Sequence, residues 1–115
     1  MDEKVRVSVR KQGEVAIIDM KGDVTSLADE PLNQAVEGIL GEGVKKIVFN
    51  FTDVNYINSS GIAILIGIIT GSGSKGANFK VYGLTPHFRK IFGMIGLTQY
   101  VAILKSEEEA LGSFA

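Results

Sequence analysis

Apolar and polar residues alternate strictly at the start of the chain. Val5, Val7 and Val9 are separated by polar or charged residues, which is the period of a half-buried strand. A second apolar run covers 15–20 and follows a Gln12-Gly13 turn. The two segments therefore predict an opening β-hairpin.

The apolar spacing then changes to that of a helix. The apolar positions of this segment are Leu32, Val36, Ile39 and Leu40. Gly41 and Gly43 end the pattern, and Ser26 with Asp29 resembles a capping box at its start. We expect one amphipathic helix here, with Pro31 near its first turn.

Two strongly apolar segments follow. Residues 47–51 are β-branched and aromatic, as in a strand that is buried on both faces and central in its sheet. Periodicity alone does not assign 62–69 to helix or strand. Ser59 and Ser60 offer N-cap chemistry before this run, so we expect a buried helix, with Ala63 and Gly67 as a small-residue packing face.

The last third of the chain continues the alternation of strands and helices. A glycine-rich connection at 71–76 precedes a strand at 79–82, and Thr85-Pro86 opens a helix. A final strand at 99–104 is followed by a capping box, Ser106 with Glu109, and a terminal helix.

This order predicts an α/β sandwich over 1–115 as a single domain. We expect a mixed, mostly parallel sheet of about five strands, with about four helices.

The composition argues against several classes of function. The chain has 12 basic and 13 acidic residues without a basic stripe, which argues against nucleic acid and acidic membranes as partners. There is no cysteine and only one histidine, His87, so thiol chemistry, a catalytic triad and a zinc site are not expected. The charged N-terminus and the lack of a long apolar run predict a cytoplasmic protein without membrane insertion.

The glycine-rich segment matches the spacing of a dinucleotide-binding loop. Such a loop has to follow a strand and open a helix, whereas 71–76 follows a predicted helix and precedes a strand. We therefore expect a surface loop and no cofactor.

The segment Asn58-Ser59-Ser60-Gly61 has two interpretations. Its serines are typical helix caps. They are also candidates for regulatory phosphorylation, which would add about −1.5 to −2 charge at the start of a helix. Local sequence alone leaves both open.

Three stretches together resemble STAS-domain proteins of the bacterial anti-sigma factor antagonist type. These are 21–24, 47–62 and 85–97, which follow the family pattern in the same order along the chain. The resemblance implies a non-enzymatic STAS-like sandwich that acts by partner switching. Ser59 would be the phosphoacceptor, with Ser60 as the second choice.

The implied partners are an anti-sigma factor that is also a GHKL-type serine kinase, and a serine phosphatase. The unphosphorylated protein would bind the kinase, and phosphorylation would release it. The residues expected to bind the partner are Asp23, Thr25, Ser26, Asn58, Ser59, Ser60, Gly61 and Ile62.

Two positions depart from the family pattern. Asn58 stands where the family usually has aspartate, and Thr25 stands where it often has another. Both changes remove negative charge near Ser59. They favour an alternative function, an unphosphorylated STAS subunit of another assembly, such as a lipid-transport ATP-binding cassette complex or a stressosome-like scaffold.

Overall fold

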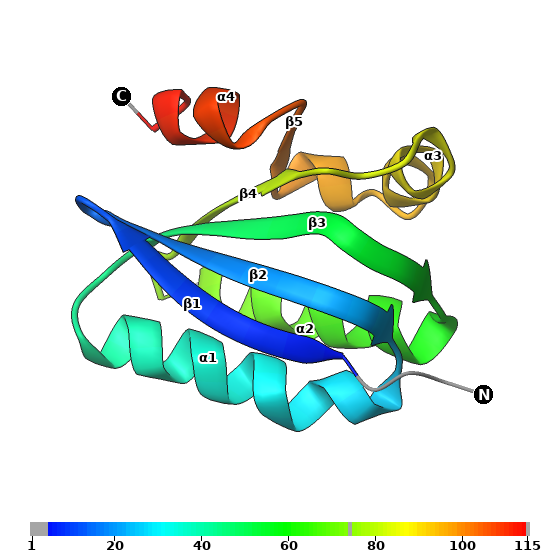
Figure 1. Ribbon diagram of the computed structural model, residues 1–115, viewed down its shortest axis with the longest axis horizontal. Helices are drawn as coiled ribbons and strands as arrows, with labels where there is room; N and C mark the ends of the chain where they lie inside the picture. The colour runs from blue at the N-terminus through cyan, green and yellow to red at the C-terminus, as the bar shows by residue number, and fades with distance from the viewer. Residues whose placement is uncertain (1–4, 74, 115) are drawn as a thin grey trace.

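A mixed five-stranded sheet forms the centre of the computed structural model, which describes residues 5–73 and 75–114 (Figure 1). Its strands are β1 (Arg6–Gln12), β2 (Val15–Val24), β3 (Lys46–Ile57), β4 (Asn78–Tyr82) and β5 (Ala102–Leu104), in the spatial order β1-β2-β3-β4-β5. β1 pairs antiparallel with β2, and all other pairs are parallel. The mostly parallel sheet is confirmed, as is the central place of the 47–51 run.

Four α-helices within the described residues cover both faces of this sheet. They are α1 (Asp29–Gly41), α2 (Ser59–Gly73), α3 (Pro86–Met94) and α4 (Glu107–Gly112). In Figure 1, α1 and α2 lie below the sheet and α4 lies above it. Two 3-10 turns, Ser26–Ala28 and Leu97–Gln99, precede α1 and β5. The α/β sandwich is therefore confirmed.

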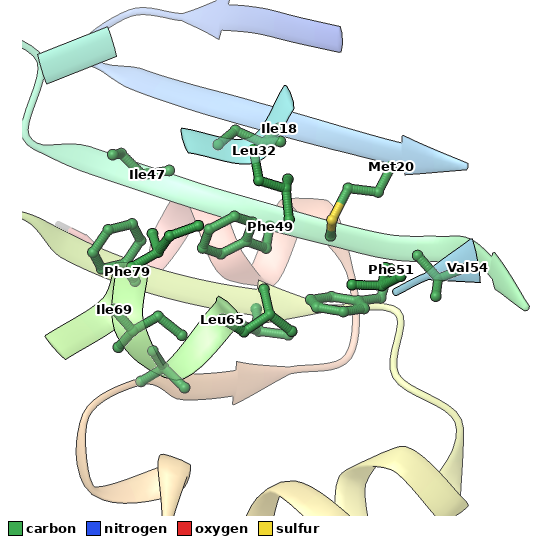
Figure 2. Close-up of a cluster of buried hydrophobic side chains, with 14 of the residues drawn as sticks. Ile18, Met20, Leu32, Ile47, Phe49, Phe51, Val54, Leu65, Ile69 and Phe79 are labelled. Atoms are coloured by element: carbon green, nitrogen blue, oxygen red, sulfur yellow. The ribbon is translucent and has the colours of Figure 1, made fainter. Parts of the chain in front are cut away.

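The larger core lies between the sheet and the helices α1 and α2. Figure 2 shows its side chains, with Phe49 and Phe51 from β3 facing Leu32 from α1 and Leu65 from α2. Phe49 stacks on Phe79 at 5.5 Å between ring centroids. Each large apolar side chain buried here contributes about 1.5–3 kcal/mol, so this layer holds α2 firmly against β3.

A smaller core lies on the opposite face, beneath α4. Its buried members are Val15, Ile17, Val48, Tyr82 and Ala110. Because β2 and β3 are covered on both faces, they need apolar residues at successive positions rather than an alternating pattern. This explains the continuous apolar runs in the sequence.

Helix capping agrees with the sequence at the starts of α3 and α4 and differs at the start of α1. Thr85 Oγ1 accepts from Phe88 N at 3.1 Å, and Ser106 Oγ accepts from Glu109 N at the same distance, so both predicted caps are confirmed. The predicted cap Ser26 is wrong. Thr25 caps a 3-10 turn instead, and α1 begins only at Asp29.

The last strand and the end of α2 also differ from the prediction. β5 covers only Ala102–Leu104, because Gly96 at φ +82° turns the chain into the 3-10 turn Leu97–Gln99. α2 continues to Gly73, so the first half of the predicted 71–76 loop belongs to the helix. Ser74 lies outside the described residues.

The predicted small-residue packing face of α2 is wrong. Ala63 and Gly67 are exposed, and a Cβ added to Gly67 would meet nothing within 4 Å. The buried side of this helix is formed by Leu65, Ile68 and Ile69. None of the helices in the described part of the chain is long and apolar enough to cross a membrane.

Candidate functional site

The long strand β3 carries the chain to the site. β3 pairs with β4 only from Lys46 to Asn50, and beyond that point it pairs with β2 alone. Two register shifts in the β2–β3 pairing let β3 advance by an extra residue each time. The strand therefore ends at Ile57, beyond the end of β4.

β2 and β3 end side by side on the right of Figure 1, where α1 and α2 begin. Val24 is the register partner of Ile57. This arrangement brings 23–28 next to 55–62, and we call the surface that these two segments form the Ser59 face.

Asn58 joins the two segments. Its backbone N donates to Val24 O at 3.2 Å, and its side-chain Oδ1 accepts from Gly61 N at 2.8 Å. Asn58 is therefore the N-cap of α2, and the predicted cap role of Ser59 and Ser60 is wrong. Asparagine is among the best N-cap residues, so its identity was the signal in the sequence that pointed to this role.

Gly61 allows the close contact between α2 and β2. It is buried, and a Cβ placed on it would lie 2.1 Å from Val24 O. No side chain other than hydrogen fits at this distance unless the backbone moves. The glycine therefore sets how closely the start of α2 approaches β2.

Ser59 and Ser60 are the first two residues of α2, and both are exposed. Because Asn58 supplies the cap, their hydroxyls are not needed to hold the helix. The first amides of a helix lack partners within the helix and carry partial positive charge. The exposed hydroxyl of Ser59 thus lies beside a weakly positive helix end.

Thr25 and Gly61 are buried within this region rather than exposed on it. Thr25 is only 3% exposed, and its Oγ1 accepts from Leu27 N at 3.2 Å. A direct contact of these two residues with a partner, as expected from the sequence, does not fit their burial. They shape the surface from beneath.

The other residues that were expected to bind the partner differ in their exposure. Ser26, Ser59 and Ser60 are exposed, whereas Asp23 and Asn58 are half-buried. Ile62, which the sequence placed among the residues expected to bind the partner, is half-buried and packs against the core.

Two exposed apolar side chains on this face were missed by sequence reasoning. Leu27 is 52% exposed and Tyr56 is 50% exposed. Leu27 lies in the 3-10 turn, which packs against α2, and Tyr56 lies three residues before Ser59. The sequence predicted a strand over 47–51 only, whereas β3 continues to Ile57 with two register shifts in its pairing with β2, so the exposure of Tyr56 was not predicted.

The Ser59 face has the character of a recognition surface. The described residues contain no group of three His, Asp or Glu side chains placed to hold a metal ion. In the pairing of β2 with β3, Lys21 lies beside Asp53, and both of these oppositely charged side chains are exposed. Exposed hydroxyls beside exposed apolar side chains suit contact with another protein.

A separate polar network lies on the α4 side of the sheet. Its members are Arg10, Asp19, Asn50, Tyr82 and Glu107. Arg10 donates to both Asp19 oxygens at 2.5 and 2.9 Å and to Glu107 Oε1 at 2.5 Å. The Tyr82 hydroxyl donates to the same Glu107 oxygen at 2.9 Å. The network therefore connects four strands, β1 to β4, to the start of α4.

These contacts shift several pKa values. Hydrogen bonding to Arg10 lowers the pKa of Asp19 and of Glu107. Burial, together with the hydrogen bond to Glu107, raises the pKa of Tyr82 to about 12. The sequence indicated only a terminal helix that opens with Ser106 and Glu109, and it did not show the link between Glu107 and Arg10.

Comparisons with known proteins assign the chain to one family. Residues 6–110 match the family described as the STAS domain. The chain is 21% identical over 110 residues to BtrV of Bordetella bronchiseptica, a protein provisionally assigned as an anti-sigma factor antagonist. The match covers 96% of this chain and 95% of BtrV.

Solved structures show the same fold. An anti-sigma factor antagonist from Mycobacterium paratuberculosis superposes with a TM-score of 0.78 at 18% identity, covering 95% of this chain and 92% of that one. The phosphorylated form of SpoIIAA, a cell fate determinant of Bacillus, gives a TM-score of 0.73 at 20% identity. That match covers 96% of this chain and all of SpoIIAA.

Proposed function

The chain belongs to the STAS domain family, and from this membership we propose that it is an anti-sigma factor antagonist that acts by partner switching. In this proposal the unphosphorylated protein binds a serine-kinase anti-sigma factor through the Ser59 face. Phosphorylation of Ser59 by that kinase ends the complex, and a serine phosphatase restores it. The protein itself performs no catalysis.

One observation carries the proposal. Ser59 is exposed at the first position of α2 while Asn58 performs the capping. Its hydroxyl is therefore available to a kinase, and its modification does not remove a hydrogen bond that holds the helix. A serine that served as the cap would be a poorer switch, because its phosphorylation would disturb the helix start.

The surroundings explain how a phosphate would end the complex. Leu27 and Tyr56 supply exposed apolar area on the same face, which a partner would cover. A phosphate at Ser59 is stabilised in the free protein by the helix end and by water. Under a docked partner the phosphate loses that water. Phosphorylation therefore raises the free energy of the complex more than that of the free protein, and the affinity falls.

Asn58 is compatible with this switch. Asparagine and aspartate cap helices about equally well, so the neutral side chain of Asn58 performs the capping that an aspartate would perform here. The difference is one negative charge beside Ser59. We propose that this charge tunes the choice of kinase rather than the fold.

The test uses the GHKL-type kinases encoded in the same genome, each incubated with the full chain and ATP. Intact-mass and phosphopeptide analysis should find one phosphate, on Ser59. Calorimetry with the kinase that modifies it should show binding of the wild type and of Ser59→Ala. Ser59→Asp should bind at least about tenfold more weakly.

Ser60→Ala and Ser60→Asp are the matched controls, because Ser60 is the neighbouring exposed serine of the same helix turn. They should leave phosphorylation at Ser59 intact and change affinity less than Ser59→Asp does. Equal binding by Ser59→Ala and Ser59→Asp would overturn the switch.

A second candidate is an unphosphorylated subunit of another assembly, and the neutral Asn58 favours it. Stable binding to a transport ATPase from the same genome, without phosphorylation by any of the kinases, would support this alternative.

A further inference from the structure

The outer surface of α3 and the turn after it combines apolar and basic side chains. Met94, Ile95 and Tyr100 are 76%, 42% and 61% exposed. Arg89 and Lys90 are exposed on the same helix, and residues 83–106 contain no acidic side chain. We call these five residues the α3 patch. Exposed apolar side chains gathered on one segment are typical of an interaction surface.

The α1 region carries the opposite charge. Residues 22–44 contain no basic side chain and five acidic ones, namely Asp23, Asp29, Glu30, Glu37 and Glu42. Glu30 and Glu37 are exposed and lie two helical turns apart, so they point from the same side of α1. The overall charge of −1 thus hides two surfaces of opposite sign.

A groove of about 400 Å³ lies beside this acidic side, between α1 and the edge strand β1. Its apolar lining includes Ala35 and Ile39 from α1 and Val9 from β1, of which Val9 is 40% exposed. Lys11 and Glu42 line it as well and form an ion pair with each other. The groove therefore has a largely apolar lining whose two charged residues neutralise each other, while Glu30 and Glu37 lie on the same helix outside it.

We infer that copies of this protein associate head to tail, with the α3 patch of one copy seated on the α1 groove of the next. Met94 and Ile95 enter the groove, and Arg89 and Lys90 face Glu30 and Glu37. The contact covers apolar area on both copies and also the open edge of β1, which is otherwise a site for unwanted pairing. This assembly is a property separate from the switch at Ser59.

The placement of the two surfaces determines the form of the assembly. In Figure 1, α1 lies below the sheet, and α3 lies at its upper right. Because the contact joins two different surfaces, it does not close on itself as a twofold dimer and instead gives chains or rings. Opposite charges across the contact make the association weaker as salt increases.

Sedimentation velocity of the full chain tests this inference, at protein concentrations from about 10 µM to about 1 mM in low and high salt. The wild type should form larger species as its concentration rises. R89E/K90E and E30K/E37K should each weaken this association at least about tenfold. The variant that combines all four substitutions should regain it, because the charges are exchanged between the two surfaces.

The matched control is K45E/K75E, which changes the net charge as much as R89E/K90E does but lies outside both surfaces. It should associate like the wild type. Circular dichroism melts confirm that each variant is folded.

Three results would overturn the inference: a wild type that stays monomeric throughout, a control that dissociates as well, or a four-substitution variant that stays monomeric. Binding of a monomeric wild type to acidic lipid vesicles through Met94 would assign the patch to a membrane surface instead.

Discussion

At the scale of single residues, the site depends on two residues next to Ser59, Asn58 and Gly61, which are not themselves modified. Asn58 holds the start of α2 through its side chain and β2 through its backbone. Gly61 lets the helix approach Val24 O closely. Ser59 is thereby left exposed, with its hydroxyl outside the capping interaction. The residue that would be modified and the residues that position it are thus separate.

The capping role of Asn58 predicts different free energies of unfolding for two substitutions at this residue. Asn58→Ala should lower the free energy of unfolding by about 1 kcal/mol, because it removes the acceptor for Gly61 N. Asn58→Asp should change it by less than about 0.5 kcal/mol, since aspartate caps equally well. Urea denaturation measures both.

Ser59→Ala is the control for this prediction. Its hydroxyl does not cap α2, so the substitution should cost less than about 0.5 kcal/mol. A loss for Ser59→Ala as large as that for Asn58→Ala would mean that the serine holds the helix after all.

The two glycines of α2 should respond in opposite ways to alanine. Gly61→Ala forces a methyl group against Val24 O and should lower the free energy of unfolding by about 1–3 kcal/mol. Gly67→Ala adds a methyl group in open space on the same helix and should raise it by up to about 1 kcal/mol. Thermal and urea unfolding measure the pair. Equal effects would contradict the close contact at Gly61.

At the scale of elements, α4 is held by charge as well as by its small apolar cluster. The helix has only six residues, too few to be stable by itself. Its own residue Ala110 is buried in the smaller core, and its first residue Glu107 accepts hydrogen bonds from Arg10 and Tyr82. The docking of α4 therefore depends on the charge of Glu107.

Acid should weaken this docking. The pKa values of Asp19 and Glu107 are lowered in the folded protein. Their contribution to the free energy of unfolding is therefore complete above the pKa that these carboxyls have in the unfolded chain, and it is lost as pH falls through their pKa in the folded protein. Glu107→Gln should therefore cost about 0.5–1 kcal/mol at pH 7, and the difference from the wild type should shrink as pH falls below about 5.

Urea denaturation across this pH range measures the effect, with Glu108→Gln as the control. Glu108 is the exposed neighbour in the same helical turn, and its substitution should change little at any pH. A Glu107→Gln cost that did not vary with pH would show that packing, rather than charge, holds α4.

At the scale of the whole molecule, the Ser59 face lies at one end of a rigid layer. The start of α2 contacts β2, and its later turns place Leu65 and Ile69 in the main core. A new charge at Ser59 is therefore expected to change the surface without rearranging the sheet. A binding switch of this kind needs no second fold.

Amide NMR spectra should show this directly. Ser59→Asp should shift resonances mainly within 23–28 and 55–63, and leave those of β4, β5 and α4 unchanged. The melting temperature should change by only a few degrees, since the substitution touches no buried contact. Ser60→Asp is the matched control, and shifts spread across β4 and α4 in Ser59→Asp would contradict a local switch.

Much of this molecule follows from its sequence. The hydrophobic periods predict the order of strands and helices, the buried β3 and the caps Thr85 and Ser106, because these features depend on neighbours a few residues apart. The motif around Ser59 and its place before an apolar helix are local in the same sense, so the family and the candidate residue were visible without coordinates.

Only the tertiary structure decided which side chains at the site do what. The sequence suggested the serines as caps, Ala63 and Gly67 as the packing face, and Ile62 as a residue that contacts the partner. The structure instead has Asn58 as the cap, Gly61 as the close contact, and Leu27 and Tyr56 as the exposed apolar side chains. The physical reason is that these roles depend on how closely α2 approaches Val24 and on the register shifts between β2 and β3. Both are set by contacts between segments more than thirty residues apart, which no local pattern records.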